Sequence, residues 1–344
     1  MNFIGKRLKI ARKIKGFSQE KLSQKLNKEV SKQSISKYER GLMNPGSSIV
    51  NKLAEVLDVK IDYFFRPFKN ELKSLNFRKK TKLSKKNEDK IKFEVLDKLE
   101  RYIELEEIVG SKKDFKNPFE NNVIKNKEEA ERYAEKLRKK WEFGLQNPLL
   151  NLSELLEEKG IHIIEVEVDE NFDGLSSFSN GNYFIVINKN FDNVRKRFTL
   201  SHELAHLLFE FENKEEKLCN QFSGAFLLPQ KIIFTEFGRK RTSISLRELI
   251  TIKENYGISL QGVVERLYNL EIISKTSRKN FYIYLNKKGW KKNEPGVYSS
   301  IEYSERFEQL LNKALALNLI SLSKAAALAN KSIYQIREDF VCPI

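Results

Sequence analysis

Two of the three histidines in this 344-residue chain stand four residues apart, in the run His202-Glu203-Leu204-Ala205-His206. Residues i and i+4 lie on the same face of an α-helix, so both imidazoles can bind one Zn²⁺ ion. The carboxylate of Glu203 can accept a proton from an attacking water and return it to a leaving amine. Two histidines buried in an apolar helix without a partner would be costly. The pattern therefore predicts a hydrolytic zinc site rather than two structural core histidines.

A catalytic zinc site needs a third protein ligand. The metzincin extension is excluded, because Phe209 and Glu212 occupy the positions where it needs glycine and histidine. The next helix, predicted over 214–228, offers Glu216 as the ligand. Asn220, one turn later, can orient one of the histidines from behind. Glu215 competes with Glu216 for the ligand role.

The elements that must position these residues follow from changes in hydrophobic period. Helices are predicted over 127–142, 149–159, from about 193, 246–256, 260–270, 304–317 and 321–330; strands over 161–168, 174–178 and 183–188; and a turn over 179–182. On the helix after the histidine pair, Cys219 is expected to be a small buried residue rather than a ligand. His162 falls in a strand and is expected to be structural.

Two expectations concern the substrate. If the strand 183–188 is an exposed edge strand, an extended peptide could pair with it and present a carbonyl to the metal. No donor for the developing oxyanion stands out, and Tyr183 and Arg195 are the only candidates.

Three runs together resemble the ImmA/IrrE family of zinc metallopeptidases. They are Arg197-Phe-Thr-Leu-Ser-His-Glu-Leu-Ala-His206, Glu216-Lys-Leu-Cys-Asn-Gln-Phe222 and Phe226-Leu-Leu-Pro229, and the similarity covers about residues 127–235. The resemblance implies a zincin-like α+β domain in which His202, His206 and Glu216 bind Zn²⁺ and Glu203 is the base. It also implies a protein substrate, a repressor or regulator of a stress or mobile-element response.

The net charge of +16 is concentrated in the first quarter of the chain. Residues 1–92 contain 25 lysines and arginines against 9 acidic residues, whereas residues 93–344 contain 38 of each. A basic module attached to a neutral body favours a polyanionic partner. The chain has only two cysteines, no long apolar run and no signal-peptide core, so we expect a cytoplasmic protein without a membrane segment.

Residues 1–66 predict a bundle of short helices, with Ser18 and Ser31 as N-caps of the second and third. The third helix opens with outward polar residues, of which glutamine can pair with adenine and lysine can reach guanine or phosphate. The expected base-reading residues are Lys32, Gln33, Ser34 and Lys37. The expected phosphate contacts are Lys6, Arg7, Lys9, Arg12, Lys13 and Arg40.

This stretch resembles an XRE-type (Cro/cI-like) helix-turn-helix domain. The resemblance rests on Phe17-Ser-Gln-Glu-Lys-Leu22, on Val30-Ser-Lys-Gln-Ser-Ile-Ser-Lys-Tyr-Glu-Arg-Gly41 and on Pro45. It implies double-stranded DNA as partner and a homodimer as the usual assembly. The interval from Leu26 to Ile35 is about two residues longer than the family pattern, so we expect a longer turn before the reading helix.

The sequence thus predicts a multidomain, mainly α protein with a small β-sheet. The expected parts are a helix-turn-helix domain (1–66), a basic linker and helical spacer (67–126), a zinc peptidase domain (127–240) and a C-terminal helical region (241–344). The favoured function is a DNA-binding transcriptional regulator with a zinc endopeptidase. The alternative is a regulator whose zinc site is structural or sensory.

Overall fold

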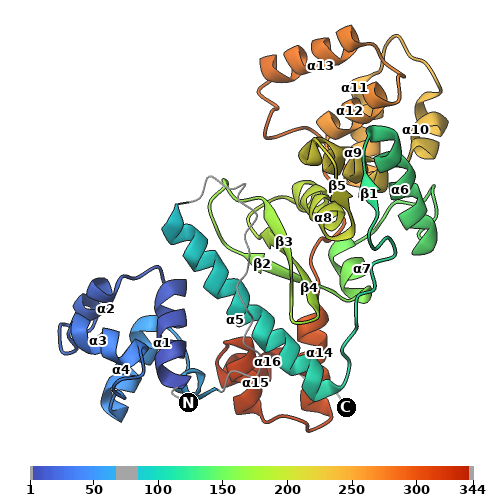
Figure 1. Cartoon of the computed structure of the whole chain (residues 1–344). Coiled ribbons are helices and arrows are strands. Elements are labelled where there is room, and N and C mark those ends of the chain that lie inside the picture. Colours follow the sequence, from blue (N-terminus) through green and yellow to red (C-terminus); the bar gives the residue numbers. More distant parts are fainter. Residues whose placement is uncertain (1–2, 67–83, 341–344) are drawn as a thin grey trace. The chain divides into compact units, whose positions relative to one another are not determined.

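The computed structural model describes residues 3–66 and 84–340 (Figure 1). These residues are mainly helical with two small sheets, which confirms the expected fold class. The chain divides into two compact units: Met1–Lys113, Phe178–Gly181 and Glu305–Ile344 form unit 1, and Asp114–Ser177 and Asn182–Ser304 form unit 2. The basic stretch 67–83 of the expected linker lies outside the described residues. None of the described helices is long and apolar enough to cross a membrane.

Unit 1 contains the expected helical bundle at its N-terminus. Its elements are α1 (Phe3–Ile14), α2 (Gln19–Lys25), α3 (Lys32–Glu39), α4 (Ser47–Leu57), the 3₁₀ helix η1 (Ile61–Phe65), α5 (Lys85–Val109), α14 (Arg306–Ala316), α15 (Leu322–Ala329) and α16 (Ile333–Asp339). Ser18 and Ser31 cap α2 and α3 as expected, each accepting a backbone N–H bond. Gly5 allows α1 to approach α3, because a Cβ there would lie 2.1 Å from the Tyr38 carbonyl oxygen.

The turn between α2 and α3 is a long one. Asn27 and Lys28 both adopt left-handed backbone conformations, with φ of 53° and 62°. The turn is held from within, because Ser23 Oγ donates a 2.6 Å hydrogen bond to the Val30 carbonyl. The extra residues therefore form an ordered loop that leaves the N-terminus of α3 capped.

A buried ion cluster joins α1 to α5. Arg7 is fully buried, and its guanidinium donates two hydrogen bonds of 2.6 Å to Glu100. Arg66 contacts the same carboxylate at 3.0 Å and Asp97 at 3.1 Å. These charges are satisfied inside the protein, so the expectation that Arg7 binds a DNA phosphate is wrong.

Arg12 is a second correction to the expected phosphate contacts. Its side chain is 6% exposed and pairs with Glu39 at 2.5 Å, while its Nη1 donates to the Phe17 carbonyl. Lys13 forms a 2.6 Å ion pair with Asp89 of α5. Much of the positive charge of α1 therefore holds the bundle together, and Lys6 and Lys9 are the members of the expected set on this helix that stay exposed.

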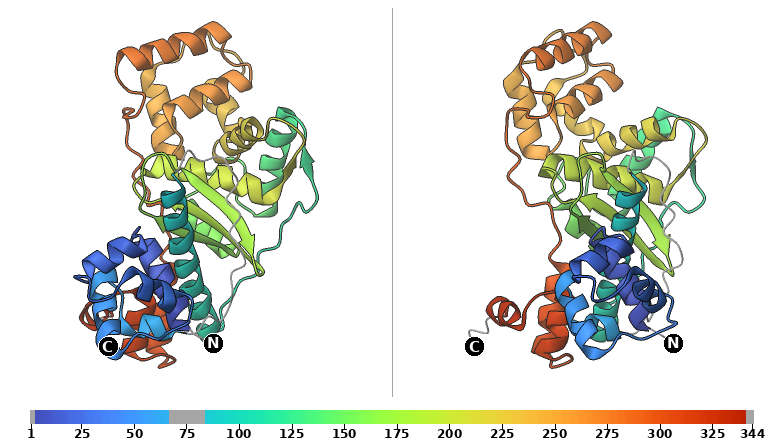
Figure 2. Two further views of the ribbon diagram at one scale, coloured as in Figure 1. Left: turned by 60° about the vertical axis from the view of Figure 1, so that its left-hand side comes forward. Right: turned by 90° about the vertical axis from the view of Figure 1, so that its left-hand side faces the viewer.

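Helix α5, which lies within the expected helical spacer, is a packing element. It lies against α1 and also against α14 and α15 (Figure 2). Tyr102 and Leu105 of α5 share an apolar cluster with the C-terminal helices, including Leu311 and Leu328. Segments from the two ends of the chain are thus both packed on α5.

Unit 2 holds a three-stranded sheet with helices around it. Its elements are β1 (Val123–Ile124), α6 (Lys127–Lys140), α7 (Leu152–Glu158), β2 (Ile161–Val166), β3 (Gly174–Ser179), β4 (Asn182–Asn188), α8 (Asn193–Leu208), β5 (Glu210–Phe211), α9 (Glu215–Leu227), α10 (Gln230–Phe237), α11 (Leu246–Tyr256), α12 (Leu260–Asn269) and α13 (Lys275–Lys287). The expected elements appear with small shifts at their ends, whereas α10, α13 and α16 are not predicted from the sequence.

The strand order decides a point that the sequence left open. The sheet runs β2-β4-β3, and β2 and β4 are parallel with Ile161 opposite Tyr183. Strand β4 is therefore central rather than an edge strand, and the strands with one free side in this sheet are β2 and β3. The Asn180-Gly181 turn between β3 and β4 forms as expected, with positive φ at both residues.

Three buried arginines tie the helices of unit 2 to one another. Arg138 donates to the Phe226 carbonyl, Arg197 forms a 2.8 Å ion pair with Glu302, and Arg266 pairs with Glu131 at 2.6 Å. Burial, with a smaller contribution from the charge of Arg197, lowers the pKa of Arg138 to about 10. These bonds connect α6 to α9 and to α12, and they fasten α8, the helix that carries the histidine pair, to the segment around Glu302.

Candidate functional site

Helix α8 carries the histidine pair at its C-terminal end. The helix begins at the N-cap Asp192, whose side chain accepts from the Arg195 N–H, and its inner face buries Leu200, Leu204 and Leu208 in the main core. His202 and His206 therefore lie on the side that faces α9, with side chains 15% and 6% exposed. The expected helix and its orientation are both observed.

The two imidazoles and one carboxylate converge. His202 Nε2 and His206 Nε2 are 3.2 Å apart, and the Glu216 carboxylate oxygens lie 3.5 Å from each of them. Ligands bound to zinc at about 2.0–2.1 Å in a tetrahedron are separated by about 3.3 Å. The spacing of these three donors thus fits one metal ion of that size.

The opposite ring nitrogens are held by α9. His202 Nδ1 lies 2.9 Å from Asn220 Oδ1, and His206 Nδ1 lies 3.0 Å from Glu215 Oε1. Both partners are acceptors, which favours the tautomer with the proton on Nδ1. That tautomer leaves a lone pair on each Nε2, the form in which an imidazole binds a metal ion.

Glu215 and Glu216 thus contact different atoms of the histidine pair. The sequence left open which of the two carboxylates faces the Nε2 atoms. Glu215 contacts the outer edge of the His206 ring, where an orienting carboxylate is commonly found, and Glu216 contacts the inner edges of both rings. Because Glu215 and Glu216 are consecutive residues of α9, their side chains project about 100° apart around the helix axis. Which of them can be a metal ligand is decided only by how α9 is oriented against α8.

Cys219 is fully buried in the core, as expected, but it is not remote from the site. Its Sγ lies 3.5 Å from His206 Nδ1, and with His202 and His206 it forms a group of metal-binding side chains. The sulfur faces the same ring edge as Glu215 rather than the Nε2 atoms. The donor set of His202, His206 and Glu216 is therefore the more coherent one.

Glu203 is held by a residue that the sequence did not indicate. Ser176 Oγ of β3 donates a 2.8 Å hydrogen bond to Glu203 Oε2. This approach depends on Gly174, since a Cβ there would lie 2.5 Å from Thr199 Cγ2 and 2.8 Å from the Val186 carbonyl. The strand thereby fixes the direction of the carboxylate from the side opposite α9.

The two suggested oxyanion donors are engaged elsewhere. Tyr183 packs against Phe115 with ring centroids 4.9 Å apart, and Arg195 binds Asp173 at 2.6 Å while stacking on Phe191. His162, 4% exposed, bonds to the Tyr183 carbonyl and is a structural residue, as expected.

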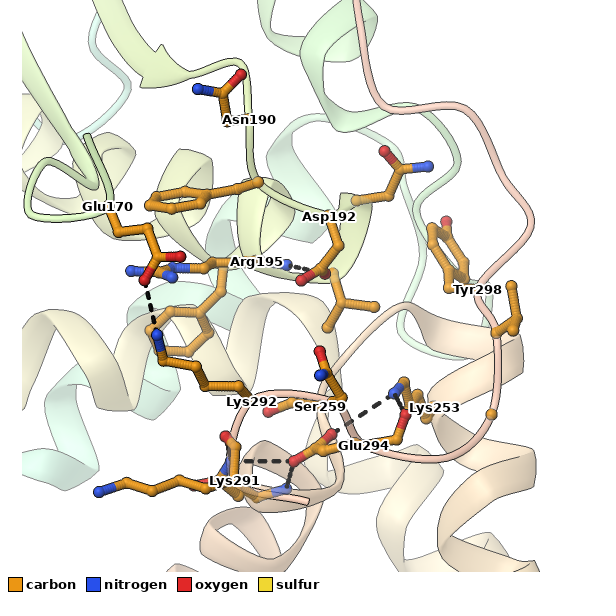
Figure 3. A pocket seen from close by; sticks show the side chains of 18 of the residues that line it. Glu170, Asn190, Asp192, Arg195, Lys253, Ser259, Lys291, Lys292, Glu294 and Tyr298 are labelled. Carbon is orange, nitrogen blue, oxygen red and sulfur yellow. Dashed lines mark hydrogen bonds and ion pairs between the residues drawn. The ribbon is translucent and has the colours of Figure 1, made fainter. Parts of the chain in front are cut away.

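A cleft of about 1220 Å³ borders the N-terminal half of α8 (Figure 3). One wall includes Arg195 and Phe198, and Phe198 also lies 6.4 Å from the His202 ring. The facing wall is the loop after α13, which is fastened by a Lys292–Glu170 ion pair of 2.7 Å and by Glu294, whose carboxylate accepts the Leu260 N–H. The cleft therefore extends along α8 to within one turn of His202.

The expected reading helix, α3, presents most of its candidate residues to solvent. Lys32, Gln33, Lys37 and Arg40 are exposed, whereas the Ser34 hydroxyl lies 3.0 Å from the capping Ser31 hydroxyl. Ser34 thus contributes to the helix start, and the other four residues form a polar and basic surface of the kind that reads a groove.

Comparisons with known proteins match two separate parts of the chain. Residues 8–64 match the family model described as helix-turn-helix, and residues 156–268 match that of the IrrE N-terminal-like domain, a peptidase family. Two proteins described as uncharacterised HTH-type transcriptional regulators, from Sinorhizobium medicae and Rhizobium meliloti, are each 36% identical to this chain over 62 residues. Those alignments cover 18% of this chain and 43% of each relative.

The second family match includes α8 and α9 and extends through most of α12, which packs on α9. It therefore contains His202, His206 and Glu216 together with the strands β2, β3 and β4. The chain therefore contains a helix-turn-helix domain near its N-terminus and, further along, a domain similar to the IrrE N-terminal-like peptidase family.

Proposed function

We propose that the IrrE-like domain is a zinc-dependent endopeptidase that cleaves a repressor or another regulatory protein in the cytoplasm, in a stress or mobile-element response. The observation that carries the proposal is the convergence of two imidazole Nε2 atoms and one carboxylate at tetrahedral spacing, on a helix that also carries Glu203 next to His202. The attached reading helix supports a regulatory role on double-stranded DNA.

The residues have distinct parts in this proposal. His202, His206 and Glu216 would hold the zinc ion, which when bound polarises a peptide carbonyl and lowers the pKa of water to about 7. Glu203 accepts the proton of the attacking water and delivers it to the leaving amine. Ser176, through its bond to Oε2, keeps the Glu203 carboxylate directed for this transfer.

The strand order supports a definite mode of substrate binding. Strand β3 is at an edge of its sheet and carries Ser176 beside Glu203. An extended peptide that adds to β3 would meet the general base, which a peptide beside the central β4 could not do. The neighbouring cleft along Phe198 offers space for side chains that flank the scissile bond.

The decisive experiment compares new protein N-termini in induced cells that carry the wild-type chain or Glu203→Gln. We expect Glu203→Gln to keep stoichiometric zinc and to lose cleavage by about 10²–10⁴-fold, because only the proton transfer is removed. Glu212→Gln, an exposed acid just after α8, is the matched control and should cleave normally. Identical termini with wild type and Glu203→Gln would refute the peptidase.

The alternative is a sensory or structural zinc site without turnover. The position of Cys219 beside His206 favours it, because sulfur ligands are typical of structural zinc. In that case Glu203→Gln would leave regulation unchanged, and removal of zinc with a chelator would alter operator affinity. For an endopeptidase, chelation should stop cleavage and leave the affinity of the reading helix for DNA unchanged.

A further inference from the structure

The overall neutrality of residues 93–344 conceals one strongly basic segment. Residues 275–292, which comprise α13 and the loop that follows it, contain six lysines, one arginine and no acidic residue. The rest of residues 93–344 then contains 31 basic against 38 acidic residues, a net charge of −7. The charge of residues 93–344 is thus unevenly distributed, although it sums to zero.

Helix α13 is an outer layer of unit 2. It packs on α12, with Leu285 2% exposed and Phe281 against the apolar cluster of these helices (Figures 1 and 2). Lys275, Lys279 and Lys287 are all exposed. With a rise of about 1.5 Å per residue, the first two are about 6 Å apart along the axis and the third is about 12 Å further.

The charges of this surface are not used for packing. Within the described parts of the chain, Lys275, Lys279 and Lys287 take part in no ion pair. By contrast, Arg278 is bound to Glu265 at 2.7 Å and stacks on Tyr268. The lysines of α13 also differ in this respect from the paired basic residues of α1.

We propose that the exposed lysines of α13 form a second DNA-binding surface, which contacts the phosphates of duplex DNA without reading its sequence. Three exposed lysines outside any ion pair, on a helix without an acidic residue, match a polyanion, and release of counterions from the duplex provides the driving force. Protein–DNA interfaces are rich in positive charge, whereas lysine is depleted from protein–protein interfaces. The composition therefore favours DNA over an acidic protein.

The test uses the full chain and a duplex that lacks an operator sequence. The variant K275Q/K279Q/K287Q is compared with K139Q/K189Q/K231Q, which removes the same charge from three exposed lysines at other places in unit 2. Fluorescence anisotropy at increasing salt gives the slope of log affinity against log salt. Each lost phosphate contact lowers that slope by about 0.9, so we expect a decrease of about 2–3 for the α13 variant and little change for the control.

Equal slopes for the two variants would overturn the proposal. So would an α13 variant that binds DNA like the control but no longer supports cleavage of a protein substrate, since that result would assign the surface to an acidic protein. Neither measurement of DNA affinity depends on zinc or on Glu203, so the outcome is separate from that of the proposed peptidase.

Discussion

Each histidine of the pair is bound at its Nδ1 atom by a side chain of α9. Asn220 bonds to His202 and Glu215 bonds to His206, so the ring positions and tautomers are set before any ion arrives. The site is therefore preorganised by two neighbouring turns of a single helix. Its affinity for a metal depends on these outer bonds as well as on the ligands themselves.

The first prediction concerns Asn220. Replacement by alanine removes the acceptor from His202 Nδ1, which frees the ring and its tautomer, and should weaken zinc binding by about 10–100-fold. Competition with a chelator of known affinity measures the effect. Lys217→Ala, an exposed change on the same helix, should bind zinc as the wild type does. Equal affinities for the two variants would contradict the role of Asn220.

At this scale the sequence was informative where chemistry depends on local spacing. The i, i+4 histidines, Glu203 and Asn220 lie on two helices whose periodicity fixes the faces they share. Ser176 could not be found in the same way, because it reaches Glu203 only through the packing of β3 on α8, which rests on the absent side chain of Gly174. Nor does any periodic signal separate Glu215 from Glu216.

Among the elements, α5 joins the N-terminal bundle of unit 1 to its C-terminal helices. It supplies Glu100 and Asp97 to the buried arginines of the reading bundle and covers the apolar face of α14 and α15. The sequence assigns Arg7 and Arg12 of α1 to DNA phosphates wrongly, because a basic helix has the same pattern whether its partners are phosphates or carboxylates. Likewise, the place of a strand in its sheet depends on chain topology rather than on the strand's own residues, so the sequence left open whether β4 is an edge strand.

The second prediction concerns Glu100. Glu100→Gln keeps the side-chain shape but leaves Arg7 buried without its charged partner, a loss of about 3–5 kcal/mol for a broken buried pair. The midpoint of the unfolding transition of unit 1 should fall in thermal denaturation. Glu107→Gln, at an exposed position of the same helix, is the control and should unfold close to the wild type. A similar midpoint for both would show that the cluster adds little stability.

At the scale of the whole molecule, the helical bundle of residues 3–66 is not structurally independent of the rest of unit 1. Deletion of residues 1–66 would remove Arg7 and Arg66, the partners of the Glu100 carboxylate, and would leave Asp97 paired with Arg101 of α5 alone. Loss of DNA binding after such a deletion would therefore mix the loss of contacts with damage to unit 1. Point changes on the exposed surface of α3 are the cleaner test.

The third prediction concerns Gln33, which is exposed on α3. Gln33→Ala should cost about 1–3 kcal/mol of discrimination at one base pair of the operator and leave affinity for unrelated duplexes unchanged. Selection from random duplexes followed by binding titrations measures both quantities. Lys25→Ala, an exposed change on α2, serves as control and should keep the base preference. An unaltered preference in Gln33→Ala would remove this residue from the reading set.

The distribution of unit 1 over both ends of the chain sets an order for folding during translation. Residues 114–304, which make up most of unit 2, leave the ribosome before α14 and α15 exist, and domains generally fold as units. The apolar face of α5 is covered only when those last helices arrive. A truncated product that stops near residue 304 would therefore contain the folded histidine pair of unit 2 and an incomplete unit 1.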